Sequence, residues 1–206
     1  MKYPRSATIA LALALVGAVS LVGQSSPAPA PAAPAKPRVA SSGGVSPHET
    51  ISTIIGVDRR TGNRVTITYG RPFSRDPKTG ETRKIWGGLV KWDKADRLGA
   101  DEATLLLTQQ PIQFGETVVP AGAYTLYLVP SETGASQLAF STNLGKWGVP
   151  VDETHDLARV ELKKESLETA VDQLTLAVVN NKDTGAGLLT ISWENTRFSA
   201  PFTVKK

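Results

Sequence analysis

The sequence predicts an all-β fold: a single antiparallel β-sandwich of about ten strands, jelly-roll-like or Greek-key, with a barrel as the alternative. Three observations lead to this prediction. Short runs rich in β-branched and aromatic residues recur at intervals of about 8–12 residues. Clusters of glycine, proline, asparagine and aspartate separate these runs. No stretch has the 3.6-residue period of a long amphipathic helix.

The first two predicted strands, residues 50–57 and 63–69, flank a polar turn and should form a hairpin. In the second run Val65, Ile67 and Tyr69 alternate with threonines. This period of two is typical of a strand with one buried and one solvated face. The following Gly-Arg-Pro sequence ends the strand, because proline cannot continue a central strand.

The remaining strands are predicted from the same signals. Residues 166–169 are interpreted as a short connection, with one helical turn as an option, and Glu194 with Asn195 as a turn. The expected strands are residues 103–108, 112–119 (with a turn at Gly115), 123–129, 137–142, 159–162, 173–179, 187–193 and 198–204.

Residues 83–104 do not fit this strand pattern. The segment contains two tryptophans, three glycines and nine charged residues in twenty-two positions, without a strand or helix period. Long irregular loops are uncommon in compact domains and often carry function. A second irregular segment with glycine and tryptophan covers residues 143–150.

The N-terminal region is predicted to be an export signal and a tether. Lys2 and Arg5 precede an apolar run over residues 9–22, as in a secretory signal peptide. We therefore expect a signal peptide at residues 1–23, a linker rich in proline and alanine at 24–45, and the β-sandwich domain at 46–206. The expected location is periplasmic or extracellular. Membrane contact is expected only through the N-terminal segment, if it stays uncleaved.

Composition excludes several classes of function. The chain has no cysteine, which excludes thiol catalysis, disulfides and cysteine-based zinc sites. The net charge of +4 is small and no basic stripe is interleaved with aromatic residues, so nucleic acid is not an expected partner. Phosphate-binding loops, dinucleotide fingerprints and the Gly-x-Ser-x-Gly motif are absent, and no cofactor is expected. His155 lies in an acidic segment, but one histidine is a weak basis for a zinc site, and no metal is expected.

Several motifs carry a family resemblance. They are Tyr69-x-Arg71-Pro72, Arg83-Lys84-Ile85-Trp86-Gly87-Gly88-Leu89-Val90, Arg97-x-Gly99-Ala100-Asp101-Glu102-Ala103-Thr104, Pro120-Ala121-Gly122-x-Tyr124-x-Leu126, Lys146-Trp147-Gly148 and Trp193-Glu194. In combination they resemble the exported bacterial proteins catalogued as domain-of-unknown-function family 2911. The likeness spans residues 51–204 and implies an exported β domain without an established activity. The chain has Asp101 where the family pattern has asparagine.

The segment 83–104 and the arginine that precedes it supply the candidate ligand-binding residues. Arginine suits carboxylate, phosphate or sulfate groups, and tryptophan faces suit sugars or cations. The candidates are Arg71, Trp86, Trp92, Arg97, Asp101 and Glu102. The alternative is a structural clasp, in which Arg97 pairs with Glu102 or Arg71 with Asp101, and the tryptophans form a small core.

Three functions follow from these residues. We favour a non-enzymatic domain that binds a small polar or anionic ligand, with carbohydrate as the favoured class. A glycan hydrolase would need two carboxylates about 5–10 Å apart, such as Glu102 with Asp101 or Asp93. Adjacent residues on a strand point to opposite faces, which argues against Asp101 with Glu102. The third function is a structural or protein-interaction module of the cell envelope, with an envelope protein as partner.

Overall fold

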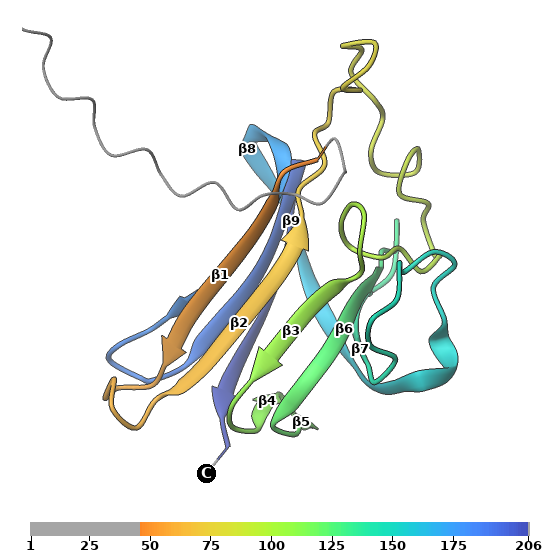
Figure 1. The fold of residues 1–206 in the computed structure, drawn as a ribbon. Coiled ribbons are helices and arrows are strands. Elements are labelled where there is room, and N and C mark those ends of the chain that lie inside the picture. Colours follow the sequence, from red (N-terminus) through yellow and green to blue (C-terminus); the bar gives the residue numbers. More distant parts are fainter. Residues whose placement is uncertain (1–45, 206) are drawn as a thin grey trace, which may run out of the picture. The chain divides into compact units, whose positions relative to one another are not determined.

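The computed structural model describes residues 46–205, so the predicted signal peptide and linker lie outside the described residues. The described chain forms nine strands and a three-residue 3-10 helix, η1 (Glu153–His155) (Figure 1). The strands are β1 (His48–Ile55), β2 (Asn63–Gly70), β3 (Thr104–Thr108), β4 (Ile112–Phe114), β5 (Thr117–Val119), β6 (Gly122–Val129), β7 (Ser136–Ser141), β8 (Asp156–Asn180) and β9 (Gly187–Val204). Within residues 46–205, no helix is long and apolar enough to cross a membrane.

Hydrogen bonds join the nine strands in the order β1-β2-β3-β6-β7-β8-β9-β4-β5, and every pair is antiparallel. The strands at the two ends of this order, β1 and β5, do not pair with each other, so the sheet does not close into a barrel. The prediction of an all-β antiparallel fold is confirmed, and the arrangement is consistent with a β-sandwich.

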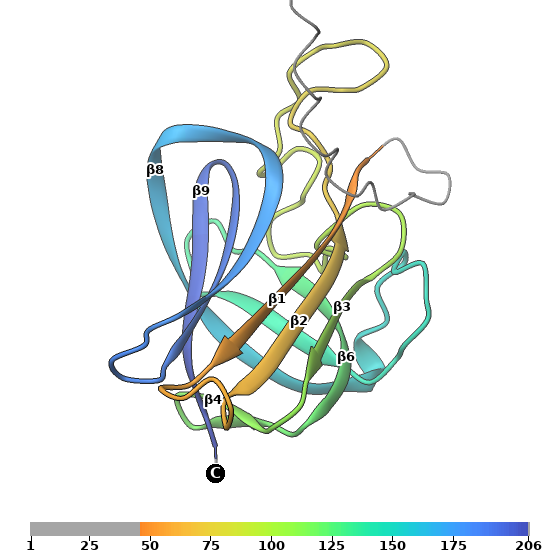
Figure 2. The ribbon, with the colours of Figure 1, turned by 60° about the vertical axis from the view of Figure 1, so that its left-hand side comes forward.

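Two long strands connect the layers of the sandwich. The first part of β8 pairs with β7, while its last part pairs only with the beginning of β9. The register of β8 against β9 shifts on both sides of Val171, and β8 curves strongly there (Figure 2). The short connection predicted at residues 166–169, with one helical turn as an option, is therefore wrong, because this stretch is part of β8. The predicted turn at Glu194 and Asn195 is an irregularity within β9, where Glu194 has a positive φ of 51°.

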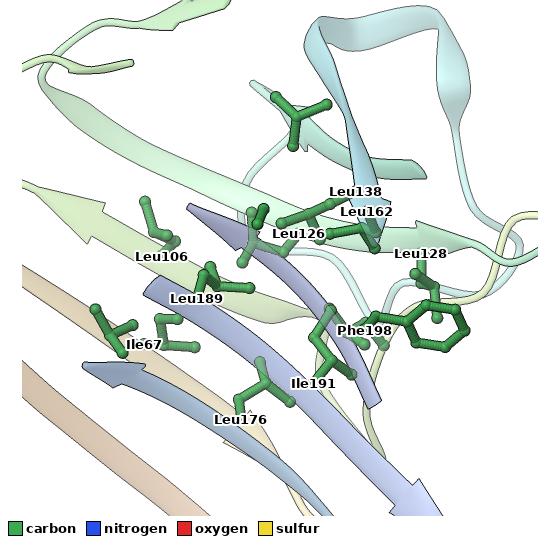
Figure 3. Packing of buried hydrophobic residues seen from close by; sticks show 14 of the residues in the cluster. Ile67, Leu106, Leu126, Leu128, Leu138, Leu162, Leu176, Leu189, Ile191 and Phe198 are labelled. Carbon is green, nitrogen blue, oxygen red and sulfur yellow. The ribbon is translucent and has the colours of Figure 1, made fainter. Parts of the chain in front are cut away.

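The core lies between the two layers. Ile67, Leu106, Leu126 and Leu138 project from β2, β3, β6 and β7 toward Leu176, Leu189 and Ile191 of β8 and β9 (Figure 3). All seven side chains are buried. Each side chain of this size contributes about 1.5–3 kcal/mol when it is removed from water. The alternation of apolar and polar residues that predicted these strands thus corresponds to the core and outer faces of one layer.

The outer face of that layer carries threonine hydroxyls together with the exposed side chains of Leu105 and Leu107. One row across the strands consists of Thr50, Thr68, Leu105, Thr125 and Ser141, each opposite the next in the strand register. The hydroxyl groups of Thr50 and Thr68 lie 2.9 Å apart and share a hydrogen bond. The segments 71–103 and 142–155, yellow to olive and teal in Figure 1, border this face and meet where the Ala103 amide donates to the Lys146 carbonyl.

Candidate functional site

The segment 83–104 is anchored in the core by Trp86. Only 7% of this residue is exposed. Its ring packs edge-on against Trp193 and Phe198, with centroid distances of 6.3 and 5.2 Å, and stacks on Trp92 at 6.0 Å. Its indole Nε1 donates to the carbonyl of Trp193 over 3.2 Å. Trp86 therefore holds the segment against β9, as the structural alternative for this residue predicts.

Glu194 forms a second anchor beside the first. Its carboxylate accepts a hydrogen bond from the backbone amide of Ile85, which is buried next to Trp86. Burial raises the pKa of Glu194, and this hydrogen bond opposes the shift. Trp92 is half-buried, and the Lys164 ammonium lies 4.7 Å from the centroid of its ring. The two tryptophans predicted as ligand contacts thus lie against β8 and β9.

Arg71 connects β2 to the last part of β8. It donates from Nε to the Leu174 carbonyl over 3.0 Å and from Nη2 to the Thr175 hydroxyl over 2.8 Å. Its ion pair is with Glu49 at 3.4 Å, instead of the expected Asp101. The Tyr69 hydroxyl also donates to Glu49, over 2.6 Å, and burial followed by this bond raises the pKa of Tyr69. The guanidinium of Arg71 is thus used within the fold.

Arg97 lies at the border between the segment 83–104 and the outer sheet face. It donates from Nε to the Gly99 carbonyl over 3.2 Å and from Nη1 to the Asp101 carbonyl over 2.8 Å. Its guanidinium carbon is 5.7 Å from the ring centroid of Trp147. Arg97 therefore stabilises the turn 97–101 and also positions an aromatic ring of the neighbouring segment.

Asp101 and Glu102 lie close to the same histidine. The Nε2 atom of His48 is 3.6 Å from Asp101 Oδ2 and 3.1 Å from Glu102 Oε2. The expectation that the two side chains point to opposite faces is wrong, because Asp101 lies outside the strands with a positive φ of 64°. Asparagine and aspartate are the side chains that tolerate this conformation best. Asp101 therefore adopts this conformation at little cost, as an asparagine would.

A first hollow opens between the outer sheet face and the segment 142–155. Its volume is about 480 Å³, within the usual range for ligand pockets. Arg97, Tyr127, Asn143, Asp152 and His155 line it, and we call it the His155 hollow. Its walls combine hydroxyl, amide, imidazole and charged groups with the apolar side chains of Val149, Pro150 and Val151.

A second hollow of about 450 Å³ lies beside the first and is lined by His48, Thr68, Glu102 and Leu105; we call it the His48 hollow. The two hollows share four lining residues: Ala103, Thr125, Lys146 and Trp147. Trp147 therefore stands between them, and 56% of it is exposed. The chain has only two histidines, and each of them lines one hollow.

The segment that carries Trp147 is fixed to the sheet at two places. The Thr125 hydroxyl donates to the Asn143 carbonyl over 2.8 Å. Gly148 has a positive φ of 82°, and a Cβ atom there would lie 3.0 Å from Ala103 and 3.1 Å from Arg97. Because glycine adopts this conformation without strain and leaves room for the contact, it brings the tryptophan close to the sheet.

A hydrogen-bonded cluster supports the His155 hollow from below. The Tyr127 hydroxyl donates to Asp156 over 2.5 Å and accepts from Arg159 Nη2 over 2.7 Å. Arg159 Nε also donates to Asp156, over 2.7 Å. Burial, followed by the bond to Asp156, raises the pKa of Tyr127. These bonds keep the tyrosine neutral and rigid, which suits a pocket wall better than a proton-transfer group.

The polar groups at the rim of the His155 hollow are also ordered. His155 Nδ1 lies 3.0 Å from Asp152 Oδ2, and Asn143 donates to the same carboxylate over 3.2 Å. Hydrogen bonds from Thr154 lower the pKa of Asp152, so this carboxylate stays ionised. Within residues 46–205, no group of three or more histidine, aspartate or glutamate side chains is placed to hold a metal ion.

The structure thus divides the predicted ligand contacts. Arg97 and Glu102 line the hollows, Asp101 lies beside His48, and Arg71, Trp86 and Trp92 line neither hollow. Asp93, a predicted catalytic partner of Glu102, instead accepts a hydrogen bond from Ser131 over 2.8 Å. Sequence reasoning did not select Lys146, Trp147 or His48 as contacts. The available signal was the second irregular segment with glycine and tryptophan, residues 143–150.

Residues 46–202 match the model of a protein family described as "Protein of unknown function (DUF2911)". No curated protein and no solved structure matches the chain.

Proposed function

The chain belongs to this family, and from that premise and the geometry of the two hollows we propose that it is an exported, non-enzymatic domain that binds a small polar or anionic ligand of the carbohydrate class. The observation that carries the proposal is Trp147, which stands largely exposed between two hollows walled by polar side chains. Export rests on the charged N-terminus and the apolar run of residues 9–22.

An exposed tryptophan that is held in one orientation favours a ligand with a flat apolar face. Arg97 lies against the Trp147 ring, and Gly148 packs on Arg97 and Ala103, so the ring is positioned before a ligand arrives. Such preorganisation reduces the entropy lost on binding. Sugar rings combine apolar C–H faces with hydroxyl groups at their edges. They therefore match an aromatic platform that is surrounded by hydrogen-bonding groups.

The polar groups around the ring suit the edges of a sugar. Thr125 offers a hydroxyl oxygen and His155 an imidazole to the hydroxyl groups of a sugar. The Asp152 carboxylate already has four hydrogen-bond contacts, with Thr154, Asn143 and His155, and holds these groups in place. Lys146 and Arg97 add positive charge and favour a ligand that carries a carboxylate or sulfate. In this proposal, these groups act only as hydrogen-bond or charge partners of the ligand. The Tyr127 cluster is rigid, and the pKa of Asp152 is lowered, so neither is adapted to proton transfer at neutral pH.

The proposal is tested by calorimetry and thermal shift with a panel of neutral and acidic oligosaccharides. We expect a ligand of the panel to bind, and Trp147→Ala to weaken that binding by about 2 kcal/mol or more, which is about 30-fold. The melting temperature of this variant should stay close to that of the wild type because the side chain is largely exposed.

Val179→Ala is the matched control, because Val179 is also an exposed apolar residue and lies outside both hollows. It should bind like the wild type. The proposal fails if no oligosaccharide binds, or if Trp147→Ala binds as tightly as the control. Mass spectrometry of the recovered oligosaccharide should show no cleavage; cleavage would contradict the non-enzymatic assignment.

A further inference from the structure

We propose that the ligand is a linear oligosaccharide of alternating acidic and neutral sugars, which crosses Trp147 and occupies both hollows at once. This inference rests on the proposed function and adds the length, the charge and the placement of the ligand. Three observations support it: a common strand row beneath both hollows, a shared centre, and a charge pattern that differs between the centre and the ends.

Both hollows lie over one row of the sheet, and the segment 143–148 crosses this row at Thr125, whose hydroxyl donates to the Asn143 carbonyl. Thr68, Leu105, Thr125 and Ser141 come from β2, β3, β6 and β7, and each is opposite the next in the register. Thr68 and Leu105 line the His48 hollow, Ser141 lines the His155 hollow, and Thr125 lines both. Neighbouring strands are about 4.8 Å apart, so the row extends about 14 Å. This length exceeds a single sugar ring and suits a short chain.

The two hollows share their central residues. Ala103, Thr125, Lys146 and Trp147 line both, so a chain that leaves one hollow enters the other along the tryptophan. The segment 143–148 forms a ridge between the hollows, because its backbone is bonded to Thr125 and Ala103. The exposed ring of Trp147 belongs to this ridge, so an extended ligand that packs on the ring reaches both hollows.

Charge divides the surface into a cationic centre and mixed ends. Lys146 lies at the centre, and within residues 46–205 its side chain takes part in no ion pair. The guanidinium of Arg97 already donates to two backbone carbonyls, so Lys146 is the group best placed to receive an anion.

At each end a carboxylate accompanies a histidine. Glu102 lies 3.1 Å from His48, and Asp152 lies 3.0 Å from His155. Both carboxylates repel a second acidic sugar, and the imidazole beside each of them is a hydrogen-bond partner for sugar hydroxyls. An acidic sugar at Lys146 with neutral sugars on both sides matches this pattern, and an alternating polymer supplies it.

The test measures affinity against both ligand length and ligand charge. Hyaluronan oligosaccharides alternate glucuronate with N-acetylglucosamine, and chito-oligosaccharides contain neutral N-acetylglucosamine-type sugars only. Disaccharides, tetrasaccharides and hexasaccharides of each series are titrated into the full chain by calorimetry. We expect the acidic hexasaccharide to bind at least about tenfold more tightly than both the acidic disaccharide and the neutral hexasaccharide, as a charge-assisted contact permits.

Two variants locate the effect. Lys146→Gln should reduce the affinity for the acidic hexasaccharide to that for the neutral one. Lys182→Gln, in the turn between β8 and β9, should change neither of these two affinities. Thr68→Val should lower the affinity for the hexasaccharide and leave unchanged the affinity for a disaccharide held in the His155 hollow.

The outcomes separate the two proposals. If length has no effect, or if both series bind equally, this inference is overturned while a carbohydrate site at Trp147 remains. If Lys182→Gln and Lys146→Gln weaken binding equally, the attraction is a general surface effect and the inference is also overturned. If no member of either series binds, both this inference and its basis are rejected.

Discussion

Replacing Trp86 by alanine tests whether the segment 83–104 is a structural clasp. The substitution removes the ring contacts with Trp92, Trp193 and Phe198 and the hydrogen bond to the Trp193 carbonyl. The residue is 7% exposed, so nearly all of its side-chain area is buried. The vacated space would remain as a cavity between the segment and β9.

The expected loss of stability follows from the buried area. An aromatic side chain buries about 150–250 Å², which at about 25 cal/mol per Å² corresponds to about 4–6 kcal/mol. Substitutions of buried tryptophan or phenylalanine by alanine usually cost about 3–5 kcal/mol. We therefore expect a decrease of about 3–5 kcal/mol in the free energy of unfolding. For a domain of this size, that lowers the melting temperature by about 6–20 °C.

Urea unfolding followed by far-UV circular dichroism measures the change, because it does not depend on the deleted fluorophore. Trp86→Phe is a useful second variant. It keeps an aromatic ring against Phe198 but removes the N–H donor, and should cost about 1–2 kcal/mol. Trp147→Ala is the control, since this tryptophan is 56% exposed and should cost less than about 1 kcal/mol.

A small effect would refute the reasoning. If Trp86→Ala lost less than about 1 kcal/mol, the contacts of this ring would not hold the segment. Equal losses for Trp86→Ala and Trp147→Ala would likewise show that burial does not separate the two tryptophans.

Three further predictions concern the residues around this clasp. Arg71→Ala should lower the free energy of unfolding by about 1.5–3 kcal/mol in urea titrations, because the guanidinium links β2 to β8; unchanged stability would contradict this role. Burial raises the pKa of Asp96, so its stabilising contribution is present below its unfolded pKa and is lost as pH rises through the folded pKa. Asp96→Asn should therefore be more stable than the wild type at neutral pH but not in acid. Parallel pH profiles of the melting temperature for the two proteins would contradict this prediction. A Cβ at Gly70 would lie 2.1 Å from the Ala100 carbonyl oxygen, so Gly70→Ala should cost about 1–3 kcal/mol in thermal unfolding, and a wild-type melting temperature would show that the contact relaxes freely.

Much of the fold could be predicted from local patterns. Val65, Ile67 and Tyr69 alternate with threonines, and the same residues are buried in β2. The long strands β8 and β9 were divided in the prediction because polar residues interrupt the alternation at residues 166–172 and at Glu194. A strand that bends and changes register keeps its pairing across such residues, and periodicity does not report pairing.

The candidate site could be predicted only in part. Arg97 and Glu102 were selected for their chemistry, and both line a hollow. Trp86 and Trp92 were selected by the same argument but pack against the core. Trp147, which is the exposed ring, is not among the residues that this argument selects. Nothing in the residue type separates a buried tryptophan from an exposed one.

The sequence by itself determined the class of the fold and the chemistry that is absent, because strand periodicity, turn residues and the lack of cysteine are local properties of the chain. Only the tertiary structure decided the role of each tryptophan. The carbonyl of Trp193 and the ring of Phe198 place Trp86 in the core, whereas Arg97 and Gly148 hold Trp147 at the surface. The physical reason is that burial depends on contacts between segments far apart in the chain, and such contacts leave no period in the sequence.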